Sequence, residues 1–328
     1  MGCRPVAIGG GSTRVGRPGQ GLGEGLGEGL GQDRCRSGEG YESVCVVCVT
    51  FACADFHERR DRCETRRMSL NVAVCVKQIP DPATPGSLNS ADHTLVREGK
   101  LILDDSDAYG VEMALRLVEA AGGGEVTLVS MAPNSEQSGL RTGLAMGAHK
   151  AILVSDPALK GSDALSTAKV LAAAIKRVGP DLVIAATEST DGYTGTTPVQ
   201  VAELLGMPSV TFAKKVTVNG SSLSVERQTE AGYDEVTTPL PALVSVTAGV
   251  VEVRYPSFKG IMAAKGKPLE ELTVAALGLD ANAVGWAGAG QQIVSVIDSE
   301  SRQAGEVIED DGEAHTRIVS FLDQLKVL

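Results

Sequence analysis

From residue 68 onward, short apolar runs alternate with segments in which apolar residues recur every three or four positions. The apolar runs at residues 71–77, 125–131, 151–155 and 181–186 are typical of buried strands. The segments between them carry one-sided apolar stripes, as expected of helices that pack on a sheet. This alternation predicts an α/β fold built on a parallel sheet with right-handed crossovers.

Local signals mark the ends of several elements. One helix begins near Ser106 or Asp107, both good N-cap residues, and ends at a run of glycines. A second spans residues 163–178 and ends at a Gly-Pro pair. Alternating residues around Asn219-Gly220 then predict a hairpin. A short helix is expected near the C-terminus, over residues 317–328.

Composition narrows the class of protein. The chain has 328 residues, a formal net charge of -11 and only 3% aromatic residues. An acidic balance disfavours nucleic-acid binding, and no apolar run reaches the roughly 20 residues of a membrane span. We therefore expect a cytoplasmic protein that binds neither nucleic acid nor the membrane interior.

Residues 1–67 differ from the rest of the chain. They contain ten arginines, no lysine and a Gly-Leu-Gly-Glu repeat at residues 21–32. Such a segment cannot bury enough apolar surface to fold. We expect a disordered or non-native extension before a translation start at Met68; a targeting or redox-sensing extension is the alternative. Six of seven cysteines lie here, but the single Cys45-x-x-Cys48 lacks a second pair, so no metal site is expected.

Three loops follow predicted strands, where parallel sheets bind ligands. Residues 77–82 form either a nucleotide or flavin loop or an ordinary connection. Residues 103–107 could bind Mg²⁺ or a ribose, although simple helix capping is favoured. Residues 186–197 are rich in Ser, Thr and Gly and precede a helix, which is typical of a phosphate site. A plain polar loop is the alternative there.

Catalytic signatures are missing from the sequence. There is no P-loop motif, no dinucleotide fingerprint after the strand at residues 71–77 and no nucleophile elbow. The four histidines are scattered. The chain is therefore predicted to bind a nucleotide without visibly catalysing a reaction.

Residues 251–268, VEVRYPSFKGIMAAKGKP, carry a specific resemblance. Together with residues 71–81, 141–148, 187–195 and 225–243, this segment resembles the β subunit of electron transfer flavoprotein. The resemblance covers the chain from about residue 68 to the C-terminus.

The resemblance implies a Rossmann-like parallel sheet of the adenine-nucleotide-binding type. It implies a heterodimer with an electron transfer flavoprotein α subunit that carries most of the FAD site, and an AMP that the β subunit binds structurally. It also implies electron transport in fatty acid oxidation, from acyl-CoA and related dehydrogenases to a membrane quinone oxidoreductase. The implied AMP contacts are Cys75, Asp104, Asp105, Ser106, Asp107, Met131, Ala186, Thr187, Glu188, Ser189, Thr190, Asp191, Gly192, Tyr193, Thr194, Gly195, Thr196 and Thr197.

Three positions depart from the family pattern. Asp104 replaces an Asn, and Asp81-Pro82 lies where the family approaches the flavin but lacks an aromatic residue. Asp234 stands where a Glu often meets the mobile flavin domain, so Asp234 or the adjacent Glu235 is expected to serve.

The same resemblance places a dehydrogenase-docking segment at residues 251–270, with Phe258 as its anchor. A buried core position for Phe258 is the alternative. The docking residues are expected to be Arg254, Tyr255, Phe258, Ile261, Met262 and Lys265.

The predicted organisation is thus an N-terminal extension (1–67), a nucleotide-binding α/β domain (68–250), a partner recognition loop (251–270) and a C-terminal arm that packs on a partner subunit (271–328). Three other functions remain open: a bifurcating β subunit with its own FAD, a nucleotide-hydrolysing or ligase enzyme, and a nucleotide-sensing stress protein.

Overall fold

The computed structural model describes residues 69–97, 99–132, 134–297, 305, 307–310 and 312–327, so the predicted extension lies outside the described residues. A nine-stranded sheet forms its centre, in the order β11-β5-β4-β1-β6-β10-β7-β8-β9. The strands are β1 (Val72–Cys75), β4 (Val126–Ala132), β5 (Lys150–Ser155), β6 (Leu182–Ala186), β7 (Ser209–Asn219), β8 (Ser222–Thr229), β9 (Gly232–Pro239), β10 (Ala242–Val246) and β11 (Leu269–Leu272).

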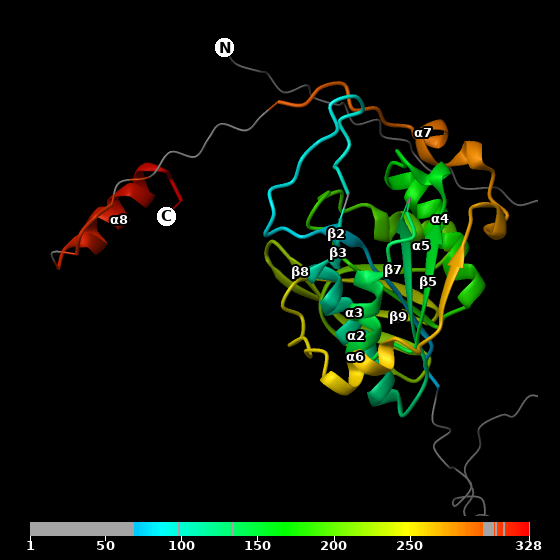
Figure 1. Cartoon of the computed structure of the whole chain (residues 1–328). Coiled ribbons are helices and arrows are strands. Elements are labelled where there is room, and N and C mark those ends of the chain that lie inside the picture. Colours follow the sequence, from blue (N-terminus) through cyan, green and yellow to red (C-terminus); the bar gives the residue numbers. More distant parts are fainter. Residues whose placement is uncertain are drawn as a thin grey trace, which may run out of the picture. The chain divides into compact units, whose positions relative to one another are not determined.

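Helices cover both faces of the parallel part of this sheet (Figure 1). One layer packs on a cluster that includes Leu128 and Ile184, and the other on a cluster that includes Val129 and Val183. Neighbouring strands from β11 to β7 all run parallel, which confirms the predicted fold class. The helices are α2 (Asp105–Ala121) and α3 (Ser138–Met146) in the first layer, and α4 (Ala164–Val178) and α5 (Thr197–Leu205) in the second.

The ends of α2 follow the expected capping chemistry. The Asp104 side chain accepts a hydrogen bond from the Ser106 backbone N–H, which satisfies one donor of the first turn. At the other end, Gly122 adopts φ 84°, a left-handed conformation that glycine takes without steric cost. The helix begins directly after its cap Asp104, which follows the short strand β3 (Leu101–Leu103). Strand β3 pairs with β2 (Gln78–Pro80).

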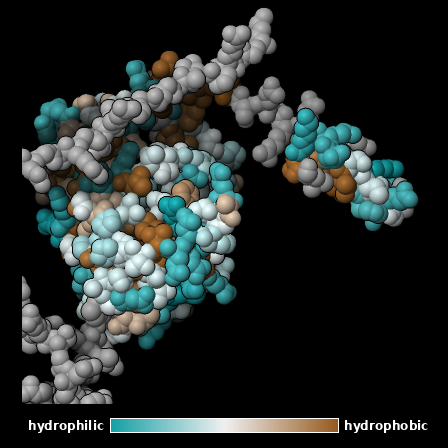
Figure 2. Space-filling view, turned by 180° about the vertical axis from the view of Figure 1, so that it is seen from behind, coloured by the Kyte–Doolittle hydropathy of each residue, from teal (hydrophilic) through white to brown (hydrophobic). Residues whose placement is uncertain are grey.

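The sheet continues beyond β7 as an antiparallel extension of β8 and β9. Asn219 pairs with Ser222 across a tight turn in which Gly220 has φ 61°, so the predicted hairpin is confirmed. Within the described residues β9 has no strand beyond it and forms one edge. From behind, the surface shows hydrophilic and intermediate residues with small hydrophobic patches between them (Figure 2).

The C-terminal third contains elements that local patterns did not reveal. Residues 251–268 hold a short helix, α6 (Phe258–Ala264), which contacts α3. Strand β11 pairs with β5, so the sheet itself extends through residue 272, across the boundary predicted at 270. The later helices are α7 (Gly285–Gly288) and α8 (Ala314–Gln324). The helix predicted near the C-terminus is thus present, and it begins before residue 317.

Candidate functional site

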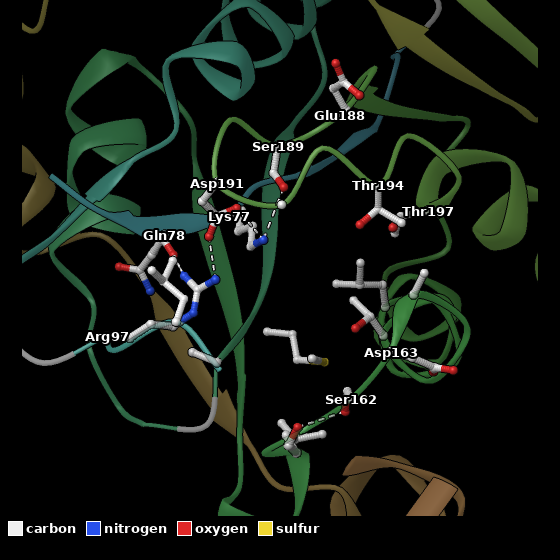
Figure 3. Close-up of a pocket in the computed structure, with 18 of the residues that line it drawn as sticks. Lys77, Gln78, Arg97, Ser162, Asp163, Glu188, Ser189, Asp191, Thr194 and Thr197 are labelled. Carbon is white, nitrogen blue, oxygen red and sulfur yellow. Dashed lines mark hydrogen bonds and ion pairs between the residues drawn. The ribbon is translucent and has the colours of Figure 1, made fainter. Parts of the chain in front are cut away.

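A cavity of about 690 Å³ lies at the carboxyl edge of the central strands. Cys75 at the end of β1, Met131 near the end of β4 and Ala186 at the end of β6 all line it. The N-terminal regions of α4 and α5 form another wall (Figure 3). This is the edge at which open α/β sheets bind ligands, and its volume lies within the range of about 300–1,000 Å³ for small-molecule sites.

Asp104 fixes the geometry of the polar loop that follows β6. Its side chain is fully buried, and Oδ2 accepts hydrogen bonds from Thr190 N at 2.8 Å and Thr190 Oγ1 at 3.1 Å. Its Oδ1 caps α2 through Ser106 N. One carboxylate therefore joins a helix N-terminus to a loop that is distant in sequence, so its role is to hold the cavity wall.

Two cations converge on Asp191 at one side of the cavity (Figure 3). Lys77 Nζ lies 2.6 Å from Asp191 Oδ1 and also donates to Ser189 Oγ, while Arg97 forms an ion pair with Oδ2. Burial opposes ionisation of Asp191, but the ammonium and guanidinium outweigh it and hold its pKa below its ordinary value. Because two positive groups face one carboxylate, this wall keeps a net positive charge that suits an anionic ligand.

The N-terminus of α5 offers a second place for an anionic group. Thr194, Gly195 and Thr197 line the cavity there. The N-cap residue Thr196 makes no side-chain hydrogen bond to the helix. Pro198 in the first turn has no N–H, so the helix dipole and the other first-turn N–H groups are what α5 offers to a phosphate.

Two titratable groups, the buried Asp107 and the partly buried Cys75, line the cavity between these walls. Burial raises the pKa of Asp107 well above its usual range, and its Oδ2 accepts a hydrogen bond from Lys77 N at 2.6 Å. Burial, helped by Asp107, raises the pKa of the Cys75 thiol to about 12. A thiol with that pKa stays protonated near neutral pH and is a poor nucleophile. The site therefore favours binding over covalent catalysis.

Most predicted nucleotide residues line this cavity, and their binding role remains a prediction. Asp104 instead supports the wall, and Tyr193 is 68% exposed. The cavity is lined by Cys75, Asp107, Met131, Ala186, Thr187, Glu188, Ser189, Asp191, Gly192, Thr194, Gly195 and Thr197; Asp104, Asp105, Ser106, Thr190, Tyr193 and Thr196 are not part of its lining.

The sequence interpretation missed several lining residues. Lys77 opens the predicted loop at residues 77–82, where the sequence indicates no role for its side chain. Arg97 and His93 belong to a segment that gave no motif, and Ser162 precedes the predicted helix at 163–178. Only the position of Lys77 at the end of a predicted strand offered a usable signal.

The segment predicted to dock a dehydrogenase exposes its apolar side chains. Phe258 is 81% exposed and Tyr255 is 93% exposed, with Ile261 and Met262 about half exposed. The alternative of a buried Phe258 is therefore wrong. The C-terminal end of this segment is attached to the α3 region, because Lys267 Nζ donates hydrogen bonds to the Leu144 and Ala148 carbonyls.

Arg254, predicted as a docking residue, has a structural role in the described chain. Its guanidinium pairs with the buried carboxylate of Glu112, at 2.6 Å from Nε to Oε2, and with Glu119 at 2.9 Å. Arg116 pairs with the same Glu112 from one helical turn away. These contacts fasten the start of the segment to α2, while docking by Arg254 remains a prediction.

Asp234 and Glu235 lie on the exposed edge strand β9. Asp234 forms an ion pair with Arg227 at 2.9 Å, and both partners are about half exposed.

Among the described residues, no group of acidic, cysteine and histidine side chains is arranged to hold a metal ion. In the same part of the chain, no helix combines the length and apolarity needed to cross a membrane.

Known proteins resemble this chain over most of its length. The electron transfer flavoprotein domain family matches residues 92–277. The electron transfer flavoprotein subunit beta of Mycobacterium tuberculosis is 39% identical over 264 residues, covering 79% of this chain and 99% of that protein. The same subunit of Thermoanaerobacterium thermosaccharolyticum is 35% identical over 262 residues, with 79% and 100% covered. The caffeyl-CoA reductase-Etf complex subunit CarD of Acetobacterium woodii is 34% identical over 241 residues, with 73% and 92% covered. The chain therefore belongs to the β-subunit family of the electron transfer flavoproteins.

Proposed function

We propose that this chain pairs with an electron transfer flavoprotein α subunit and binds AMP in the cavity at the carboxyl edge of its sheet. The heterodimer accepts electrons from acyl-CoA and related dehydrogenases and passes them to a membrane quinone oxidoreductase. The observation that carries this proposal is a cavity with an apolar floor, including Met131 and Leu171, between two positively polarised ends. An adenine nucleotide combines these same features, an apolar base and an anionic phosphate.

The FAD that carries the electrons is proposed to lie mainly in the α subunit. This chain is proposed to act as an electron-carrier subunit that supplies no catalytic residues. The raised pKa of Cys75 supports that assignment, because the cavity then lacks an activated thiol. A cytoplasmic location remains a prediction.

A bifurcating β subunit that holds its own FAD is the second candidate. FAD contains the whole of AMP, and a cavity of about 690 Å³ leaves space beyond a mononucleotide. A relative of this chain is named as part of a caffeyl-CoA reductase-Etf complex. Counting the bound FAD and AMP in the purified heterodimer separates the two candidates.

Phe258→Ala is expected to weaken the capture of electrons from a dehydrogenase. A large aromatic side chain that is 81% exposed in the free subunit has the character of a binding hot spot. The kcat/KM for the heterodimer as electron acceptor should fall about tenfold or more, a typical loss for a truncated hot spot. Steady-state assays with an acyl-CoA dehydrogenase measure this change.

Leu204→Ala provides the matched control, because Leu204 is a partly exposed apolar residue of α5 outside the docking segment. It should leave the kcat/KM unchanged. Both variants should form the heterodimer at the wild-type level. Loss of soluble heterodimer in Phe258→Ala alone would contradict the docking role.

Combined replacement Asp234→Asn and Glu235→Gln should change the rate of electron transfer and leave AMP bound. Both side chains are exposed on the edge strand, and the ion pair that the change removes among the described residues is the surface pair of Asp234 with Arg227, worth about 0–1 kcal/mol. Stopped-flow reduction of the flavin measures the rate. An unchanged rate would remove both residues from the contact with the flavin domain.

A further inference from the structure

A small hairpin, residues 87–97, crosses one side of the cavity. Val96 N donates to Ser87 O at 2.9 Å, and Asn89 N donates to Thr94 O at 2.8 Å, which ties the two arms together. The turn between them is fixed by side chains, since Asp92 Oδ1 accepts hydrogen bonds from Thr94 N and Thr94 Oγ1. In Figure 1 this segment belongs to the long cyan loop before β3. We refer to residues 87–97 as the strap.

The strap is a wall of the cavity. Asn89, His93, Thr94 and Leu95 line the space from its side, and residues 159–164 line it from the side of α4. His93 has φ 56°, a left-handed conformation that non-glycine residues seldom adopt. That conformation forms part of the turn at the tip of the strap, where His93 N donates to Asn89 O at 2.8 Å.

Two ion pairs hold the strap, and they differ in burial. At its root, Arg97 pairs with Asp191, whose side chain is only 8% exposed. At its tip, Asp92 Oδ2 lies 3.0 Å from Lys160 Nζ, and these side chains are 23% and 54% exposed. The attraction between exposed charges is weak and is screened by salt, while a buried pair is screened much less. The tip is therefore held more weakly than the root.

We propose that the strap closes over the adenine nucleotide of this subunit and that the Asp92–Lys160 ion pair is the latch that sets how fast the nucleotide leaves. The inference rests on the proposed function, since it takes the cavity to hold a nucleotide. The latch joins the hairpin before β3 to the connection before α4, and both segments line the cavity. In this proposal, separation of the tip from Lys160 widens the way out for a ligand that lies between them.

The chemistry of Asp92 supports a permanently charged latch. Hydrogen bonds from Thr94 and Lys160 lower its pKa to about 2. The carboxylate is thus ionised at neutral pH. Salt concentration is therefore the variable that opens the latch.

The test measures nucleotide exchange in the full-length heterodimer. Holoprotein is mixed with an excess of radiolabelled AMP, and incorporation is followed after rapid desalting; labelled FAD is used if two FAD are bound. Asp92→Asn and Lys160→Met should each speed exchange about two- to fivefold, the range expected for loss of an exposed ion pair. High salt should speed exchange in the wild type and leave Asp92→Asn nearly unchanged.

Lys150→Met is the matched control, because it breaks an exposed pair with Glu125 at 2.7 Å that does not line the cavity. Its exchange rate should equal that of the wild type. Wild-type exchange rates in Asp92→Asn and Lys160→Met, with nucleotide present, would overturn the strap while leaving the proposed function intact. A wild-type heterodimer without AMP or a second FAD would instead overturn the proposed function and the strap with it.

Discussion

Replacing Glu112 with alanine should lower the free energy of unfolding by about 3 kcal/mol. Glu112 is 1% exposed, and both of its carboxylate oxygens accept hydrogen bonds from Arg254. Removal of the carboxylate leaves Arg116 and Arg254 without their buried partner, although both can turn toward water, which places the loss at the lower end for a broken buried pair. Because Arg254 fastens the docking segment to α2, the same change should loosen the start of that segment.

Urea unfolding of the wild type and variant measures the loss. Glu125→Ala is the matched control, since it removes a carboxylate from the exposed pair with Lys150 and should cost less than about 1 kcal/mol. Hydrogen exchange over residues 251–257 reports the loosening. Equal losses of stability in the two variants would show that the Glu112 cluster behaves as an ordinary surface pair.

The contribution of Glu112 should depend on pH in a defined direction. Burial works against the charged form, but the hydrogen bonds from Arg254 and Arg116 prevail and lower its pKa. A group with a lowered folded pKa stabilises the fold above its unfolded pKa of about 4.3. The difference between wild type and Glu112→Ala should thus be full at neutral pH and shrink as pH falls through the folded pKa. A difference that grows toward acid pH would contradict this assignment.

Asp104→Ala should weaken nucleotide binding about tenfold or more and cost about 2 kcal/mol of stability. The variant removes the cap of α2 and leaves the N–H and hydroxyl of Thr190 without their acceptor. A lost N-cap costs about 1 kcal/mol, and an unsatisfied buried donor about 1–3 kcal/mol. The loop that lines the cavity would then lose its tie to the sheet edge.

Isothermal titration with AMP, after removal of the bound nucleotide, measures the affinity of the heterodimer. Asp280→Ala is the control, because Asp280 caps a different helical turn and does not line the cavity. It should leave the affinity at the wild-type value. Wild-type affinity in Asp104→Ala would show that the loop keeps its shape without this carboxylate.

Patterns within short stretches of sequence sufficed for the parallel sheet. Strands such as β4 and β6 are buried along their length, and their apolar runs show it directly. The loop at residues 186–197 could be located because a ligand site in this fold follows from strand ends alone. The hydrogen bonds that connect this loop to Asp104 could not be predicted. In the sequence Asp104 looks like a helix cap, and its second partner, Thr190, is far along the chain.

The parts of the site that could not be predicted depend on ion pairs between residues far apart in the sequence. Lys77 and Arg97 are distant in sequence from Asp191, with which both form ion pairs in the folded chain. Asp92 and Lys160 are likewise distant in sequence and form an ion pair in the folded chain. Arg254 is a further case in which a long-range ion pair is hidden from the sequence. Its place in the segment at residues 251–268 predicts docking, whereas in the folded chain it pairs with the buried carboxylate of Glu112.

The central claim is that the cavity at the carboxyl edge holds an adenine nucleotide within an electron-carrying heterodimer. The most direct test is to purify the chain with its α subunit and count FAD by absorbance and AMP by chromatography of the released cofactors. We expect one FAD and one AMP per heterodimer. Two FAD would assign the cavity to a second flavin, and a heterodimer that carries a single FAD with no second nucleotide would contradict nucleotide binding in the cavity.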